Sequence, residues 1–236
     1  MTTIHGSISK LVDNSKIMFE SLGCISSNIA NYNTNSYKAQ RFETFMKAGG
    51  VIQGVVRTDH SAGDLMATFR ELDVGIEGMG YIPVTGKKGE VSYIRGGSFA
   101  VNSEGYIVSN GDMIVGGGIK LPVNYEKIKI KPDGTVLTSS SKENIFKEIG
   151  KIPVVTFKNP EGLAIEEGNL VKQTAESGKA ELVLNHTKLK QGKIEKANID
   201  PFFMINETLR INASILSSSK FIKLLDNMYR ESISLR

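Results

Sequence analysis

Residues 200–233, DPFFMINETLRINASILSSSKFIKLLDNMYRESI, decide the fold of this 236-residue chain, because they predict one long C-terminal helix. Asp200 is a favoured N-cap and Pro201 a favoured first helical residue, so the helix is expected to begin there. No glycine follows Gly192, and a helix that reaches Ile233 is roughly 50 Å long at about 1.5 Å per residue. The core of a small domain needs much less than that length.

The apolar residues of this segment follow the a/d pattern of a coiled coil, in which each series repeats every seven residues. The stripe consists of Met204, Thr208, Ile211, Ile215, Ser218, Ile222, Leu225 and Tyr229. A second apolar set lies beside the stripe or widens it: Phe202, Ile205, Leu209, Leu216, Phe221, Leu224 and Met228.

The N-terminus has the same pattern from about Thr3 to Asn31, although Gly6 and Gly23 each weaken a helix by roughly 1 kcal/mol relative to Ala. Its stripe consists of Ile4, Ile8, Leu11, Ser15, Met18, Leu22, Ile25 and Ile29. One interpretation is that both helices simply cover a core, as most amphipathic helices do. However, both stripes are close to the coiled-coil period and lie at opposite chain ends, so their natural partners are each other and copies of themselves. We therefore assign both stripes, apart from Ser15 and Ser218, to a predicted assembly interface.

The middle of the chain is predicted to be β-structure. Glycine and proline are concentrated there, and both residues punctuate strands and turns. From Leu72 to Asn198, short apolar runs alternate with turn pairs such as Asp133-Gly134, which indicates an all-β sandwich or barrel. Residues 37–71 are predicted to form an extended connector that bends at its glycines.

The predicted fold class is therefore α+β, with long N- and C-terminal helices that pair as a coiled-coil-like layer around an inserted all-β domain. The predicted domains are a discontinuous helical assembly domain (1–36 and 199–236), the connector (37–71) and an all-β outer domain (72–198).

A search for reactive residues finds no catalytic, cofactor-binding or metal-binding site. His5, His60 and His186 are isolated from one another and from Cys24, so the spacing typical of metal ligands does not occur. Cys24 is the single cysteine, which excludes a disulfide within the chain. The glycines of residues 75–80 have the order G-x-x-G-x-G, which is not that of a phosphate-binding loop. We predict no cofactor and no enzymatic activity.

The charge pattern argues against nucleic acid as a partner. The net charge is +4, but its 29 basic residues are interspersed with 25 acidic ones, and no groove-reading motif accompanies the lysines of residues 188–196. No apolar run approaches the roughly 18–20 residues of a membrane span. The first twenty residues also lack the apolar centre of a cleavable signal peptide.

One stretch is specific enough to indicate a family. Residues 25–38, ISSNIANYNTNSYK, resemble the N-terminal signature of bacterial flagellar rod and hook proteins, which reads roughly N-x-A-N-x-N-T-x-G-[YF]-K. The matching residues are Asn28, Ala30, Asn31, Asn33, Thr34, Tyr37 and Lys38. Asn35 and Ser36 replace the usual Pro and Gly, and Asn tolerates the left-handed backbone conformation better than most residues.

Three further stretches resemble the same family. Residues 72–81, LDVGIEGMGY, are similar to its "LDLAIEGDGFF" stretch, and residues 93–108 are similar to "YTRDGSF…NADGYLV". Residues 194–200, IEKANID, are similar to the "LEQSNVD" that precedes the terminal helix of the family. The compact length resembles that of the proximal- or distal-rod proteins, and the resemblance extends along nearly the whole chain.

The resemblance implies a structural subunit of the flagellar basal-body rod. Such a subunit polymerises through its terminal helices into a helical drive shaft that transmits torque from motor to hook. The implied partners are copies of itself, other rod and hook proteins and the flagellar export apparatus, which exports it without a cleaved signal. The implied location is the basal body, in the periplasmic space if the cell has an outer membrane. The alternative is a secreted or surface β-domain binding module with no polymeric role, which leaves the two long helical ends unexplained.

Overall fold

The computed structural model describes residues 4–47, 52–109, 111–140, 143–166, 169–183 and 187–234. The chain forms two compact units. The helical unit comprises Met1–Tyr32, Ala39–Asp59 and Ile199–Arg236, and the β unit comprises Asn33–Lys38 and His60–Asn198. The chain therefore passes between the units four times, at residues 32/33, 38/39, 59/60 and 198/199.

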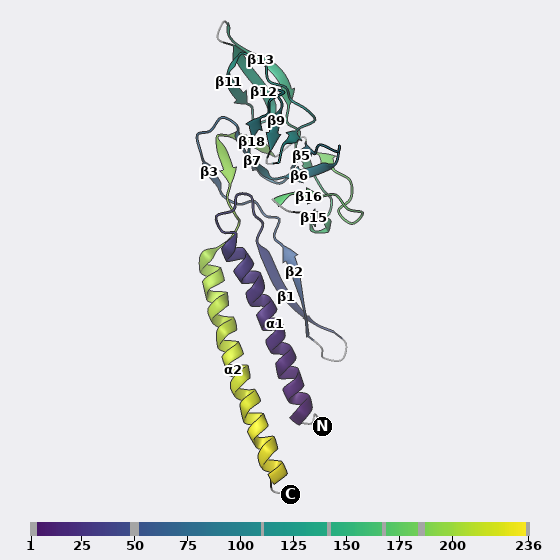
Figure 1. The fold of residues 1–236 in the computed structure, drawn as a ribbon, viewed down its shortest axis with the longest axis vertical. Coiled ribbons are helices and arrows are strands. Elements are labelled where there is room, and N and C mark those ends of the chain that lie inside the picture. The colour runs from purple at the N-terminus through teal and green to yellow at the C-terminus, as the bar shows by residue number, and fades with distance from the viewer. Residues whose placement is uncertain are drawn as a thin grey trace. The chain divides into compact units, whose positions relative to one another are not determined.

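Two long helices in contact dominate the helical unit: α1 (Ile4–Ala30) and α2 (Pro201–Ser234). They run antiparallel, as Figure 1 shows. The side chain of Asp200 caps α2, because its Oδ1 accepts hydrogen bonds from the amides of Phe202 and Phe203 at 2.9 and 3.2 Å. The predicted helices and the cap signal are thus confirmed, and so is the α+β fold class with paired terminal helices around a β-rich region.

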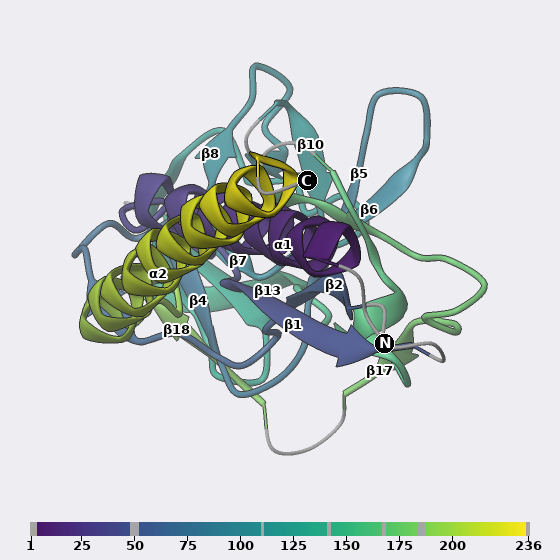
Figure 2. The ribbon, with the colours of Figure 1, turned by 90° about the horizontal axis from the view of Figure 1, so that it is seen from below.

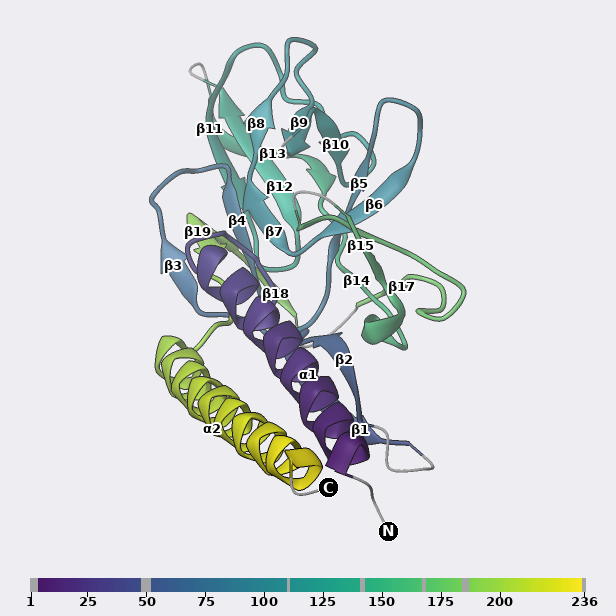
Figure 3. The ribbon, with the colours of Figure 1, turned by 60° about the horizontal axis from the view of Figure 1, so that its bottom comes forward.

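The helical unit also contains an antiparallel hairpin, formed by β1 (Gln40–Met46) and β2 (Ile52–Thr58). The hairpin contacts α1, and α1 lies between the hairpin and α2 in Figure 1. The tilted view in Figure 3 shows the same order, and in the view from below in Figure 2 the two helices cross in projection, with β1 next to α1. Residues 37–71, predicted as an extended connector, thus include a paired hairpin and are divided between the two units.

The β unit consists of short strands joined by turns. They are β3 (Leu65–Ala67), β4 (Asp73–Glu77), β5 (Ile82–Thr85), β6 (Val91–Ile94), β7 (Gly96–Ser98), β8 (Ala100–Val101), β9 (Ile107–Ser109), β10 (Met113–Val115), β11 (Tyr125–Ile130), β12 (Thr135–Ser140), β13 (Glu143–Lys151), β14 (Val155–Thr156), β15 (Ala164–Ile165), β16 (Val171–Lys172), β17 (Glu181–Leu182), β18 (Lys188–Gln191) and β19 (Lys193–Glu195). A short 3-10 helix, η1 (Pro160–Gly162), precedes β15.

The described strand pairs of this unit are antiparallel, and the largest sheet has the order β15-β16-β6-β5-β10-β9-β8. Smaller sheets have the orders β11-β12-β13, β18-β4-β7, β19-β3 and β14-β17. Fully buried aliphatic side chains from several of these strands, such as Val74, Ile82 and Val136, form the main core. The last strands β18 and β19 pair with β4 and β3, so the end of the unit returns to its beginning.

Candidate assembly faces and a buried charge cluster

The predicted stripe of α2 is the face that packs within the helical unit. Met204, Ile211 and Ser218 are buried, and α1 is the main element in contact with α2. The remaining members Thr208, Ile215, Ile222 and Leu225 are half-buried, whereas Tyr229 near the C-terminal end is 49% exposed. Much of this stripe is therefore already covered inside one chain.

The predicted stripe of α1 is covered less completely. Ile25 is buried, and Ile8, Leu11, Met18 and Leu22 are half-buried. Ile29 is 53% exposed, and the side chain of Ile4 lies outside the part that the structure describes. The two helices are in contact, and most described members of their stripes are buried or half-buried, whereas Ile29 and Tyr229 are exposed.

The helical unit exposes further apolar side chains on other faces of its helices. On α2 these are the second apolar set identified from the sequence, with Phe203 and Ile233: Phe202, Phe203, Ile205, Leu209, Leu216, Phe221, Leu224, Met228 and Ile233. On α1, Phe19 is also exposed. So many large apolar side chains on one helix pair are typical of an interaction surface.

The first signature residue, Asn28, joins α1 to the start of β1. Its Oδ1 accepts a hydrogen bond from the Gln40 amide at 2.8 Å, and its Nδ2 donates to the Gln40 carbonyl at 2.7 Å. The same Nδ2 lies 3.7 Å from Met204 Sδ, so this fully buried amide also contacts α2. The nearby Cys24 thiol donates to the Gln40 carbonyl at 3.4 Å, and burial raises the pKa of this thiol.

Asn31 satisfies a carbonyl at the end of α1, because its Nδ2 donates to Ser27 O at 2.9 Å. The next signature residues, Ala30, Asn33 and Thr34, are exposed, and Tyr37 is half-buried. The Tyr37 amide donates to Thr34 O at 3.3 Å, which closes a turn.

Ser36 stands where the family signature has glycine, and its backbone is left-handed with φ of +60°. Its amide donates to Glu195 O at 2.8 Å, and the residue is only 7% exposed. Its hydroxyl has no hydrogen-bond partner among the described residues. Ser36 therefore adopts the left-handed conformation that glycine favours, at a free-energy cost that glycine would not have.

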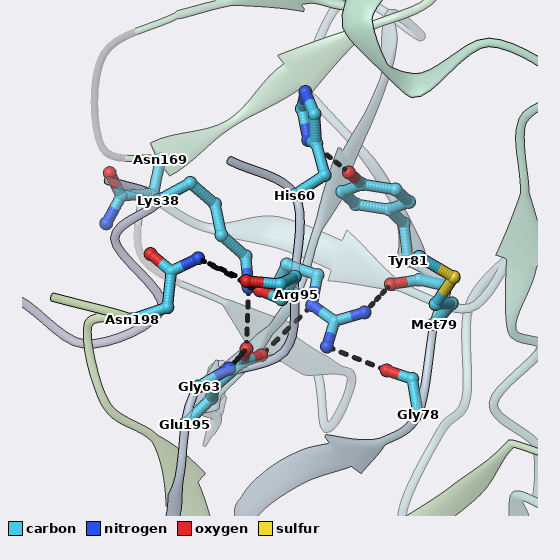
Figure 4. A network of polar contacts seen from close by, with 12 residues as sticks. Lys38, His60, Gly63, Gly78, Met79, Tyr81, Arg95, Asn169, Glu195 and Asn198 are labelled. Carbon is cyan, nitrogen blue, oxygen red and sulfur yellow. Dashed lines mark hydrogen bonds and ion pairs between the residues drawn. The ribbon is translucent and has the colours of Figure 1, made fainter. Parts of the chain in front are cut away.

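The last signature residue, Lys38, belongs to a buried charge cluster of Lys38, Arg95 and Glu195 (Figure 4). Glu195 Oε1 accepts from Lys38 Nζ at 2.7 Å and from the Gly63 amide at 2.7 Å. Glu195 Oε2 accepts from Arg95 Nε at 3.0 Å. Lys38 Nζ also donates to Ser61 O at 2.5 Å. The Glu195 side chain is fully buried, so its charge is offset by two cations and an amide instead of water.

Arg95 extends the cluster to the glycine turn that follows β4. Its Nη1 donates to Gly80 O at 2.6 Å and its Nη2 to Gly78 O at 2.9 Å. Both glycines have positive φ, 111° at Gly78 and 139° at Gly80, so an L side chain at either position would be strained. The Arg95 guanidinium lies 5.9 Å from the ring centre of Tyr81, whose hydroxyl is 3.0 Å from His60 Nδ1. Burial raises the pKa of Tyr81, and this effect exceeds that of the positive charge of Arg95, which lowers the same pKa.

All four stretches that carry the family resemblance contribute to this cluster. Lys38 comes from residues 25–38, the two glycine carbonyls from 72–81, Arg95 from 93–99 and Glu195 from 194–200. The sequence motif predicted a role for Lys38 but not for the other two charged residues, Arg95 and Glu195. The sequence contains one indication of these buried charges, because Arg95 directly follows the apolar Tyr93-Ile94 and Glu195 directly follows Ile194. A charged residue beside apolar core positions is rarely buried unless it is paired with an opposite charge.

The described residues contain no group of His, Cys, Asp and Glu arranged to hold a metal ion. None of the helices in the described part is long and apolar enough to cross a membrane. The fold and its features define a structural protein: paired terminal helices with open apolar faces, and a β unit in which the family motifs meet in a buried charge cluster.

Comparison with known proteins identifies the family. Residues 75–138 match the model of the flagellar hook protein FlgE/F/G D1 domain. The flagellar basal-body rod protein FlgG of Caulobacter vibrioides is 30% identical over 241 residues, covering 90% of this chain and 92% of that protein. FlgG of Bacillus subtilis is 29% identical over 91% of this chain and 93% of the relative. FlgF of Caulobacter vibrioides is 24% identical over 85% of both chains. The chain belongs to the flagellar basal-body rod protein family.

Proposed function

We propose that the chain is an FlgG-like structural subunit of the flagellar basal-body rod, which polymerises through its terminal helices into a helical shaft that transmits torque. The observation that carries the proposal is the similarity to FlgG along 90% of the chain. Among relatives from Caulobacter vibrioides, the identity is 30% to FlgG and 24% to FlgF, which favours the FlgG type. A family of structural proteins also agrees with the prediction that the chain is not an enzyme.

The exposed apolar faces of the helical unit give this polymer a driving force. Burying one Phe or Leu side chain contributes about 1.5–3 kcal/mol, and α2 alone exposes a series of them. Each helix already has one partner within the chain, so these faces are available to helices of neighbouring subunits. Head-to-tail contacts that do not close into a ring generate a helical tube.

In this proposal α1 and α2, which make up most of residues 1–36 and 199–236, form the inner assembly layer, and residues 72–198 form the outer domain. Residues 37–71 connect the two, and the hairpin β1–β2 adds stiffness beside α1. The remaining proposed partners are other rod proteins, hook proteins and the flagellar export apparatus. The proposed location is the rod, in the periplasmic space of a cell with an outer membrane.

The test is deletion of the gene in its own host, followed by complementation and by sedimentation of the purified chain. We expect the deletion to abolish the filament and swimming, the intact gene to restore both, and the chain to form polymer that seeds further polymer. A strict monomer with a ligand-dependent melting temperature, in a deletion strain that still swims, would establish the β-domain binding module instead.

A further inference from the structure

The chain enters and leaves the β unit through three segments, which are residues 33–38, 60–64 and 194–198. All four covalent passages to the helical unit start from these segments. Any load that the chain carries from one unit to the other therefore enters the β unit through them.

Glu195, in the third segment, accepts hydrogen bonds from residues of the other two segments. Its backbone carbonyl accepts from the Ser36 amide at 2.8 Å, and its carboxylate accepts from Lys38 and from the Gly63 amide, both at 2.7 Å. Lys38 adds a second tie between the first two segments, because its Nζ also donates to Ser61 O. Asn198 Nδ2 donates to the same carbonyl at 3.1 Å, which ties the third segment to the second.

Arg95 fixes this point to the rest of the β unit. Its guanidinium forms an ion pair with Glu195 Oε2, the carboxylate oxygen other than the one that accepts from Lys38. It also donates hydrogen bonds to the carbonyls of Gly78 and Gly80, two residues of the turn that precedes the core strand β5. Replacing a buried ion pair with apolar residues is often neutral or stabilising, so the net stability of the fold does not by itself explain the cluster. Charges of this kind are instead suited to specifying one arrangement, because a segment that slips leaves a buried charge unpaired.

We propose that Lys38, Glu195 and Arg95 are an anchor that ties the passages between the units to one point of the β unit. The rod needs this anchor for torque transmission rather than for folding of the β unit. Lys38 and Glu195 are then positioning residues, and the family motifs that contain them mark a mechanical junction. The claim about torque depends on the proposed function, whereas the claim about the anchor does not.

Lys38→Met tests the anchor, with Lys190→Met as the matched control. Lys190 lies in the same unit and forms an exposed ion pair with Glu77 at 3.2 Å. In Lys38→Met we expect the Ser36 and Gly63 amides to exchange roughly tenfold to hundredfold faster, as follows from the loss of a hydrogen bond to a charged group. The Tyr81 and Ile107 amides, which donate to the carbonyls of Val155 and Ile119, should keep their wild-type exchange rates. The Lys190→Met control should change the exchange rate of none of these four amides. Unchanged exchange at Ser36 and Gly63 in Lys38→Met would overturn the anchor.

A second test compares Glu195→Gln with the double variant Glu195→Gln/Lys38→Met, and it stays informative if either variant is less stable than the wild type. Glu195→Gln removes the carboxylate that Lys38 and Arg95 both contact and leaves two buried cations at that point, so adding Lys38→Met should raise the melting temperature above that of Glu195→Gln alone. A double variant that melts no higher than Glu195→Gln would contradict the coupling of these charges.

Swimming of a deletion strain tests the mechanical role. The wild-type gene must first restore swimming, since its failure would refute the proposed function and not the anchor. We then expect Lys190→Met to swim normally and Lys38→Met to lose swimming while the protein is present at the normal level. Normal swimming by Lys38→Met, with its Ser36 and Gly63 amides exchanging faster, would refute the role in torque transmission.

Discussion

Substitution of Ser36 by glycine should stabilise the β unit. Ser36 has a left-handed backbone with φ of +60°, which costs a residue with a Cβ roughly 1–2 kcal/mol. Its buried hydroxyl has no partner among the described residues, and an unsatisfied hydroxyl costs about 1–3 kcal/mol. Glycine removes both costs but loses roughly 0.5–1 kcal/mol through the greater freedom of the unfolded chain. The expected gain is therefore about 1–4 kcal/mol.

Two further variants separate the contribution of the hydroxyl from that of the left-handed backbone. The stability of each variant is measured by calorimetry of the β-unit transition. Ser36→Ala removes the hydroxyl but keeps the left-handed strain, so its gain should be smaller than that of Ser36→Gly. Ser103→Gly is the control, because Ser103 is exposed and lies outside the positive-φ set of the described residues. It should lose about 0.5–1 kcal/mol.

A stabilisation of 2 kcal/mol corresponds to a rise in melting temperature of roughly 4–8 °C for a unit of this size. The reasoning would be refuted if Ser36→Gly lowered the melting temperature as Ser103→Gly does. A gain in Ser36→Gly that is smaller than the gain in Ser36→Ala by about 0.5–1 kcal/mol, the cost of the freer unfolded chain, would show that the backbone carries no strain.

Three other features lead to shorter predictions. Asn28→Ala should destabilise the helical unit by about 2–4 kcal/mol, measured by chemical denaturation, because both hydrogen bonds to the Gln40 backbone are lost. Cys24, the single cysteine, should react slowly with an alkylating reagent, because it is buried and its pKa is raised. Fast labelling in the native chain would contradict its position, whereas fast labelling in denaturant is expected. Hydrogen bonds from the Thr135 hydroxyl and amide lower the pKa of Asp133, so the carboxylate stabilises the fold at neutral pH. Asp133→Asn should therefore be less stable at pH 7, and the difference should vanish as the pH falls through that lowered pKa.

The sequence predicted the helices well because their signals are local. The cap at Asp200 and the seven-residue repeat act within a few turns of helix, so α2 begins where these signals place it. The hairpin in residues 40–58 was not predicted, since it exposes apolar residues such as Phe45 and Val56 on both faces and lacks a clear alternation. Burial of one face normally creates that alternation.

The charge cluster could be predicted only in part, for a different reason. Arg95 and Glu195 are a hundred residues apart in sequence, and their pairing depends on how β19 returns to β3. A single sequence contains the two charges but not the register that brings them together. The replacement of glycine by Ser36 left the shape of the signature turn undecided, and the structure resolves it as left-handed.

The central claim is that the exposed apolar faces of the terminal helices, and not those of the β unit, drive polymerisation. Leu216 on α2 and Leu182 on β17 allow a matched comparison, because their exposed fractions are 64% and 66%. The deciding measurement is seeded sedimentation of Leu216→Asp and Leu182→Asp beside the wild type. We predict that Leu182→Asp polymerises like the wild type, while Leu216→Asp stays monomeric with the melting transition of its β unit unchanged. Normal polymer from Leu216→Asp, or loss of polymer only in Leu182→Asp, would contradict the account.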